Sequence, residues 1–361
     1  MRTLKHTSQS LYHCRGFSMV ELMVALVITL ILLAGIGQIF LSSKKSFTIQ
    51  NNLARIQENG RYAMEVVISD LRRAGYWGGN ADINTISGTQ SINPAATESC
   101  TIADPSNWAR MLNRSIYGLD LSGNEKPSDS GNDYSCLKDA GATAYVRGDV
   151  ILVRYAHASA VGSITKPLPC ETGKNTIKDC YPDEYFLRSS LFRGRLFKGS
   201  ESEATDNTLV APAVRTAELV ARAYYIGTSS NTSACPADGA VPSLFRVELS
   251  SSGGLTAEEV AYGVDNLQIK YGVDSSGDGI VNRYYDGDDI DSTDDPDDKP
   301  NWEDVVATRI WLLIRAECPE TGYTNDNAYA MGNESYTPAD TAGRGYRRKL
   351  YTSTIQLRNN R

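Results

Sequence analysis

Hydrophobic residues form one long, nearly unbroken run close to the amino terminus. From Phe17 to Leu41 the chain is apolar except for Glu21, Thr29, Gln38 and small residues. These 25 residues suffice for a helix that spans a bilayer, which takes about 20. An ordinary secretory signal has only about 7–15 apolar residues and is cut after them. The pattern therefore predicts a membrane helix that stays on the protein.

A helical pattern continues beyond this run. Small or apolar residues recur at spacings of three and four, at positions 49, 53, 56, 60, 63, 67, 71 and 74. The amphipathic stretch stops at the glycine-rich segment 75–79, which suits a helix carboxyl terminus. We expect one helix over residues 17–74, about 85 Å long. Its second half should pack on a β-sheet; a coiled coil is the alternative.

The rest of the chain alternates between strand patterns and turn residues. Residues 78–144 read as loops, and strand-like runs then occupy 144–146, 149–155, 185–196, 219–226, 244–249, 260–271, 305–315 and 347–357. The run 305–314 is apolar on both faces except for Thr308 and Arg309, which predicts a central strand. Gly, Ser and Asn between the runs favour antiparallel sheets. The predicted class is α+β: one long amino-terminal helix packed on an antiparallel β-sheet domain with long, disulfide-stapled loops.

Charge divides the chain into a basic start and an acidic remainder. Arg2, Lys5 and Arg15 precede the apolar run with no acid among them, which favours an amino terminus on the cytoplasmic side. The whole chain has a net charge of −7, and loss of residues 1–16 would make it −10. An acidic protein is poorly suited to follow phosphate backbones, so we expect no nucleic-acid binding. The basic residues at 344 and 347–349 are interpreted as a solvated strand start.

The cysteines indicate disulfides. Cys14 precedes the apolar run, and six follow it: Cys100, Cys136, Cys170, Cys180, Cys235 and Cys318. None forms a CxxC pair, which argues against a zinc site. Six cysteines allow fifteen pairings, and the short loop between Cys170 and Cys180 is the first that we would choose. Three disulfides formed in an oxidising compartment are expected.

A single acid stands at the start of the apolar run. Glu21 would be costly near lipid unless it has a partner. A cut between Gly16 and Phe17 would create a positive amine on Phe17, four residues before Glu21 and on the same helix face. The amine and carboxylate could then pair within one chain or between neighbouring chains, fixing the register of packed helices. A plain signal anchor with a chance glutamate is the competing interpretation.

The segment 16–22 resembles the class III prepilin signature, with glycine before the cut, phenylalanine after it and glutamate at the fifth mature position. Beyond it, the segments 71–76, 262–268, 305–313 and 347–355 are similar to PilW-type minor pilins. The resemblance covers residues 15–77 and 255–358 and is vague between them. It implies a leader (1–16), a transmembrane and filament-core helix (17–41), an amphipathic half-helix (42–77) and a β-rich globular domain (78–361) outside the cytoplasm.

The resemblance also implies a function. It implies cleavage by an inner-membrane prepilin peptidase, N-methylation of Phe17 and burial of the helix in a filament core. The subunit would help to initiate type IV pilus assembly and lie near the tip. Its expected partners are other minor and major pilins, a PilY-type tip adhesin and the inner-membrane assembly platform. A J-type pseudopilin of a type II secretion system is the alternative, because it uses the same leader and helix.

An acidic segment in the carboxyl-terminal half resembles the start of an EF-hand loop. Oxygen-bearing side chains stand at its first, third, fifth and ninth positions, Gly279 is at the sixth, and Tyr285 replaces the usual glutamate at the twelfth. The candidate calcium ligands are Asp274, Ser276, Asp278, the Ile280 carbonyl, Asn282 and Asp286. Further aspartates follow at 288, 289, 291, 294, 295, 297 and 298, where a solvated loop is the simpler interpretation.

Signatures of catalysis are missing. The chain has no GxSxG, HExxH or GxxxxGK[ST] motif, and His157 is the one histidine beyond the apolar run. We therefore expect a structural and interaction protein rather than an enzyme. A membrane-anchored enzyme or carbohydrate-binding adhesin is a third interpretation, which a concave aromatic pocket with converging acids would favour.

Overall fold

The structure is a computed structural model. It describes residues 16–80, 82–88, 108–121, 125, 127, 137, 144–161, 168, 170–201, 214–230, 235, 241–249, 254–290, 300–338 and 341–360. The chain divides into two compact units, residues 1–51 and 52–361. The helix α1 (Met19–Leu71) contributes to both. In the first unit it carries the apolar run, and in the second it belongs to the core.

The start and end of α1 follow from local contacts. The helix begins two residues later than expected, because the Ser18 hydroxyl accepts a hydrogen bond from the Glu21 N–H (3.2 Å) and so caps it. It ends at Leu71, three residues before the predicted end. Gly75 has φ +75°, and a Cβ there would come within 2.6 Å of the Asn359 carbonyl oxygen. Only glycine therefore suits the turn that leaves the helix.

The predicted amphipathic stripe is confirmed for the second unit. The residues of α1 that are buried are Ile56, Gly60, Ala63, Met64, Val67, Asp70 and Leu71. The first two expected positions, Ile49 and Leu53, are not buried. The helix thus contributes to the core from Ile56 onward, and its apolar face matches the 3.6-residue period.

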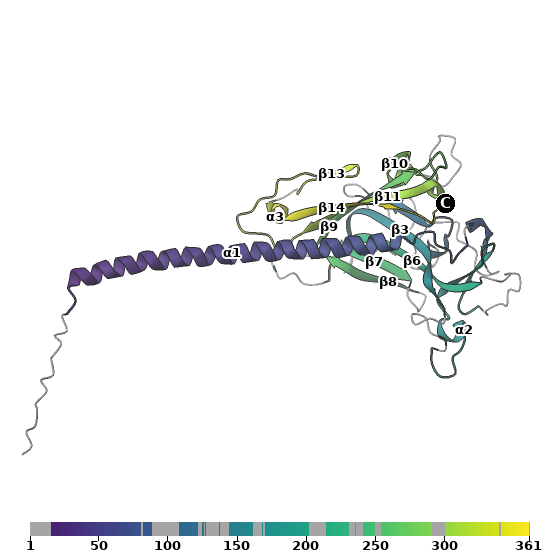
Figure 1. The fold of residues 1–361 in the computed structure, drawn as a ribbon, viewed down its shortest axis with the longest axis horizontal. Coiled ribbons are helices and arrows are strands. Elements are labelled where there is room, and N and C mark those ends of the chain that lie inside the picture. Colours follow the sequence, from purple (N-terminus) through teal and green to yellow (C-terminus); the bar gives the residue numbers. More distant parts are fainter. Residues whose placement is uncertain are drawn as a thin grey trace, which may run out of the picture. The chain divides into compact units, whose positions relative to one another are not determined.

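One large sheet contains eight of the described strands (Figure 1). They are β1 (Ile86–Gly88), β2 (Ile116–Leu119), β3 (Tyr145–Ala160), β4 (Tyr185–Ser189), β5 (Gly194–Lys198), β6 (Arg215–Thr228), β7 (Pro242–Leu249) and β8 (Leu255–Tyr262). Strand β6 is central: β3 pairs along one edge, and β4 and β7 pair in succession along the other. All these pairings are antiparallel except that of β1 with β5.

A second sheet has the order β10-β9-β11-β14. Its strands are β9 (Val264–Val273), β10 (Arg283–Tyr285), β11 (Val305–Arg315) and β14 (Arg348–Gln356), all antiparallel. Strand β11 lies between β9 and β14, so the prediction of a central strand over residues 305–314 is confirmed. A separate hairpin joins β12 (Tyr329–Met331) to β13 (Glu334–Tyr336).

Three strand predictions differ in detail. The run 260–271 is divided into β8 and β9 by Gly263, whose φ is +77°. The run 185–196 is a hairpin, β4 and β5, rather than one strand. The runs 144–146 and 149–155 are one strand, β3, that stays continuous through irregularities in its pairing. The short helices are α2 (Ile177–Cys180), α3 (Thr341–Arg344), η1 (Ile83–Thr85), η2 (Trp108–Arg110), η4 (Gly287–Asp289) and η5 (Trp302–Asp304).

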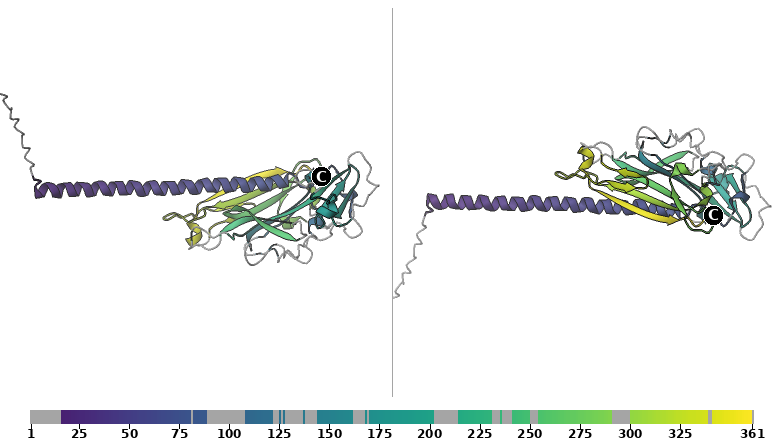
Figure 2. Two further views of the ribbon diagram at one scale, coloured as in Figure 1. Left: turned by 90° about the horizontal axis from the view of Figure 1, so that it is seen from below. Right: turned by 90° about the horizontal axis from the view of Figure 1, so that it is seen from above.

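The main core of the second unit joins α1 to both sheets. It combines helix residues such as Val67 with Tyr155 and Tyr224 from the large sheet and with Leu267 and Ile310 from the second. A further cluster, which includes Leu152, Ala223 and Phe245, covers the opposite face of the large sheet. Figure 2 shows β14 running alongside α1 at one margin of this unit. The expectation of a helix packed on antiparallel sheet is confirmed, with two sheets instead of one.

Candidate functional site

The predicted processing site lies at the start of α1. Gly16 and Phe17 precede the helix, and Phe17 is 83% exposed. Glu21 lies in the first turn. The Gly16–Phe17 bond therefore lies outside the helix, where a peptidase could reach it.

The placement of Phe17 corrects one expectation. We expected residues 17 and 21 to be one helical turn apart on the same face, but Phe17 lies outside the helix in the uncut chain. Ser18 and Glu21 have the spacing of a capping box, in which a serine caps the helix and a glutamate stands three residues later. Sequence reasoning assigned Glu21 to assembly and missed this local role, although the S-x-x-E spacing could have revealed it.

The apolar helix surface after Glu21 has no protein cover. Every large hydrophobic side chain from Phe17 to Leu41 is exposed, by 53% or more. Among the described residues, α1 is the one helix long and apolar enough to cross a membrane. Such a surface is not stable in water and requires lipid or the apolar faces of other helices. This favours a helix that is stored in a membrane or packed in a bundle.

A buried acid joins the carboxyl-terminal end of α1 to the large sheet. Asp70 accepts hydrogen bonds from the hydroxyls of Tyr155 (2.9 Å) and Tyr224 (2.5 Å) and from the Arg222 guanidinium (3.0 Å to each carboxylate oxygen). Arg222 also bonds Glu248 at 2.9 Å. Burial, and then the nearby Asp70 charge, raises the pKa of Tyr155 to about 12 and that of Tyr224 further. Both tyrosines therefore stay protonated and donate to Asp70 at physiological pH.

The predicted calcium loop connects β9 to β10. The Asp274 carboxylate accepts hydrogen bonds from the backbone N–H groups of Gly277 (2.7 Å) and Gly279 (2.5 Å), and Asn282 accepts from the Ser275 N–H (2.8 Å). Burial opposes ionisation of Asp274, but the Gly279 and Gly277 donors outweigh it and lower its pKa. Asp274, Ser276 and Asn282 are brought together, as the spacing predicts.

Other candidate ligands have different partners. The Asp278 carboxylate accepts from the Ile280 N–H (2.9 Å), and Asp286 forms an ion pair with Lys270 at 3.1 Å. Within the described ranges, no three acidic, histidine or cysteine side chains are grouped closely enough to hold a metal ion. Aspartates at 291, 294, 295, 297 and 298 lie outside the described residues. The loop therefore has an ordered geometry that internal hydrogen bonds already account for, and calcium binding stays a prediction.

Two disulfides join cysteines among the described residues. Cys170 is joined to Cys180 (Cα–Cα 5.8 Å), which is the short-loop pairing chosen from the sequence. Cys235 is joined to Cys318 (Cα–Cα 5.7 Å), across 83 residues. Cys100 and Cys136 lie outside the described residues. The disulfides support folding in an oxidising compartment.

Comparisons with known proteins found similarity to pilins. Residues 223–359 match the family model described as Type IV Pilus-assembly protein W, and residues 11–37 match the Prokaryotic N-terminal methylation motif. No curated protein matches the chain. Among solved structures, the Type IV-like pilin TTHA1219 from Thermus thermophilus is 13% identical, with 61% of this chain and 83% of that chain covered and a TM-score of 0.24.

Proposed function

We propose, from the premise that this chain is a PilW-type minor pilin of the type IV pilus, that it helps to initiate pilus assembly and takes a place near the pilus tip. The observation that carries the proposal is the order of the segments along the chain. A methylation motif over residues 11–37 leads directly into the exposed apolar half of α1, and the PilW match covers residues 223–359.

The proposed mechanism is assembly without catalysis. Cleavage after Gly16 frees the Phe17 amine, which is then N-methylated, and the apolar helix holds the subunit in the inner membrane with its amino terminus inside. On extraction, contacts with lipid are replaced by contacts with other pilin helices. Glu21 then pairs with an amine, of its own chain or of a neighbour, and sets the register, because an unpaired carboxylate in that environment is costly.

The proposed partners follow from the same mechanism. They are the prepilin peptidase, the inner-membrane assembly platform, other minor and major pilins and a PilY-type tip adhesin. The second unit (residues 52–361), which contains the strands and which we call the β-rich unit, would meet these partners outside the cytoplasm, where its disulfides form. No observation favours the secretion-pseudopilin alternative.

Gene deletion tests the proposal. Cells that lack this chain should lose most surface pili while secreting their exported enzymes normally, and expression of the chain from a plasmid should restore piliation. Lost secretion with normal pili would instead identify a secretion pseudopilin. Recovery of the membrane-extracted chain with residues 1–16 still attached, in cells that process other pilins, would refute the cleavage step.

A further inference from the structure

The second half of α1 and the edge strand β14 run alongside each other. The Tyr351 hydroxyl donates to the Ile56 carbonyl (3.4 Å), and the Asn359 side chain donates to the Arg72 carbonyl (3.4 Å). Contacts at both ends of the stretch mean that the helix and the strand follow the same direction over more than four helical turns. The cavity beside them is lined from Arg61 to Arg73 on the helix side and by Tyr351 on the strand side, and we call it the groove.

One edge of β14 is open. Among the described strands, β14 pairs only with β11. The Leu357 N–H donates to the Val306 carbonyl and the Ala316 N–H to the Arg347 carbonyl, both at 2.8 Å, so odd-numbered residues direct their backbone toward β11. The backbone N–H and C=O groups of Leu350, Thr352, Thr354 and Gln356 consequently point outward, where they can pair with another strand.

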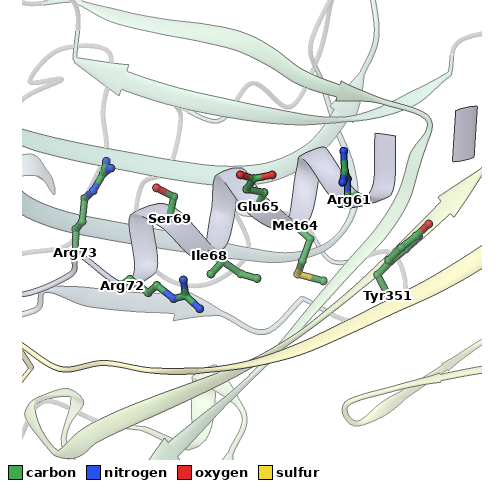
Figure 3. A pocket seen from close by; sticks show the side chains of 8 residues that line it. All are labelled: Arg61, Met64, Glu65, Ile68, Ser69, Arg72, Arg73 and Tyr351. Carbon is green, nitrogen blue, oxygen red and sulfur yellow. The ribbon is translucent and has the colours of Figure 1, made fainter. Parts of the chain in front are cut away.

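The groove beside this edge is basic with an apolar floor. A cavity of about 600 Å³ lies there, with apolar lining from Met64, Ile68 and Tyr351. Figure 3 shows Met64, Ile68 and Arg72 pointing from α1 toward the strand that carries Tyr351. The charged residues around it are Arg61, Arg72 and Arg73 against Glu65 alone. A local excess of positive charge is notable on a chain whose net charge is −7.

Two of these arginines form no ion pair among the described residues, and Glu65, one helical turn from Arg61, is the single acid in the lining. Arg73 lies 3.9 Å from Asp70 and stacks over the Tyr155 ring, whereas Arg61 and Arg72 form no ion pair with any of the described residues. Both are exposed. An arginine guanidinium is suited to bind a carboxylate with two parallel hydrogen bonds. The groove thus offers an open strand edge and unpaired cations in one place.

We propose that an extended, acidic segment of a neighbouring subunit adds to β14 as a further strand and lies in this groove. Its backbone would pair with the outward groups of residues 350–356, and its carboxylates would meet Arg72 and Arg61. Its apolar side chains would cover Met64, Ile68 and Tyr351. Strand addition would use both the open edge of β14 and the arginines of the groove. Backbone pairing with the edge supplies affinity, and the alternating side chains supply selectivity. The inference rests on the proposed function, because the added segment belongs to another subunit of the pilus.

Residue-resolved hydrogen exchange tests the added strand. Exchange would be measured on the full chain alone in detergent, and on the same chain in detergent-extracted assemblies with its pilus partners. In the assembly, the exchange rates of the outward amides at 350, 352, 354 and 356 should fall by about tenfold or more. The inward amides at 349, 351, 353 and 355 are already paired and should change less. Unchanged outward amides, or protection confined to α1, would overturn the proposal and indicate a helical partner or none.

Substitutions give a second, independent test in cells. Thr354→Pro removes one outward N–H and leaves the β11 ladder intact, which an edge strand tolerates; Thr354→Ala is its matched control. Arg72→Glu reverses one groove charge, with Arg72→Lys as its control. Thr354→Pro and Arg72→Glu should each lower surface pili about tenfold relative to their controls. If gene deletion abolishes pili but both variants assemble like the controls, the proposed function stands and this inference fails.

Discussion

At the scale of single residues, two acidic sites inside the β-rich unit affect its stability. The first is Asp70, the only acid that α1 buries among the described residues. It receives hydrogen bonds from strands β3 and β6, and so attaches the end of the helix to the large sheet. No feature of the sequence distinguishes it from the exposed acids of the same helix, because its partners lie 85 to 154 residues away.

Asp70→Asn should therefore destabilise the protein. The amide keeps the shape but removes the charge that faces Arg222, and an amide nitrogen would replace one acceptor of the tyrosine hydroxyls. Arg222 would still have its ion pair with Glu248, which limits the cost of removing the Asp70 charge. We therefore expect a loss of about 2–3 kcal/mol in the free energy of unfolding. Denaturant unfolding of the full chain in detergent measures it, with Glu58→Gln on the exposed face of α1 as control. Equal losses for both variants would contradict the anchoring role.

The second site is an acid pair, Asp120 and Asp149. Asp149 is 2% exposed and accepts the backbone N–H of Ile269 (2.7 Å). Burial, then repulsion by Asp120, raises its pKa. Burial, then the charges of Asp288 and Asp286, raises the pKa of Asp120 to about 6. The charge of ionised Asp120 disfavours ionisation of Asp149, so the two acids titrate as a coupled pair.

This pair should make stability depend on pH. The folded chain holds a proton on Asp120 that the unfolded chain releases near its usual value of 3.8, so stability falls as pH rises from about 4 to about 6. Asp120→Asn removes the titrating carboxyl and should flatten the pH dependence by roughly 1–2 kcal/mol, after allowance for solvent screening. Melting temperatures of both proteins between pH 4 and 7 measure it. Parallel curves would show that the proton is not held there.

At the scale of elements, periodicity predicted the helix and the strands whose pattern is visible in the local sequence. The run 305–315 was recognisable because both its faces are apolar, and the helix because its stripe holds the 3.6-residue period to Leu71. The division at Gly263 was missed, because a glycine in a strand pattern can equally mark a bulge. The pairing of β6 with β3, β4 and β7 was not predictable, since such contacts join distant segments and leave no local pattern.

The loop 274–286 is the element whose chemistry the sequence describes best. If it binds calcium, chelator should lower the melting temperature of the full chain, and excess calcium should restore it, because a ligand stabilises the state that binds it. Asp278→Asn should weaken this response while leaving the backbone bonds to Asp274 in place. Identical melting curves with calcium and with chelator would exclude binding at this loop.

At the scale of the whole molecule, the two halves of α1 need different environments. The apolar run 17–41 needs an apolar environment outside the chain, whereas the helix from Ile56 onward is satisfied by the core. The sequence predicted a change after Leu41, where hydropathy falls, whereas the compact units divide after Asn51 and burial of the helix begins at Ile56. Within the first half, Glu21 has two roles to separate: the expected pairing with the Phe17 amine, and the capping box with Ser18 that the S-x-x-E spacing indicates.

Glu21→Gln separates these two roles. Glutamine serves at this position of a capping box as glutamate does, so the helix start and leader cleavage should be unchanged. The variant cannot pair electrostatically with the Phe17 amine, so its incorporation into filaments should fall about tenfold or more. Immunoblots of sheared pili and of membranes, with amino-terminal sequencing of the retained chain, measure both steps. Glu58→Gln, farther along α1 and exposed, is the control. A cleaved Glu21→Gln chain that enters pili as efficiently as this control would leave Glu21 with the capping role alone.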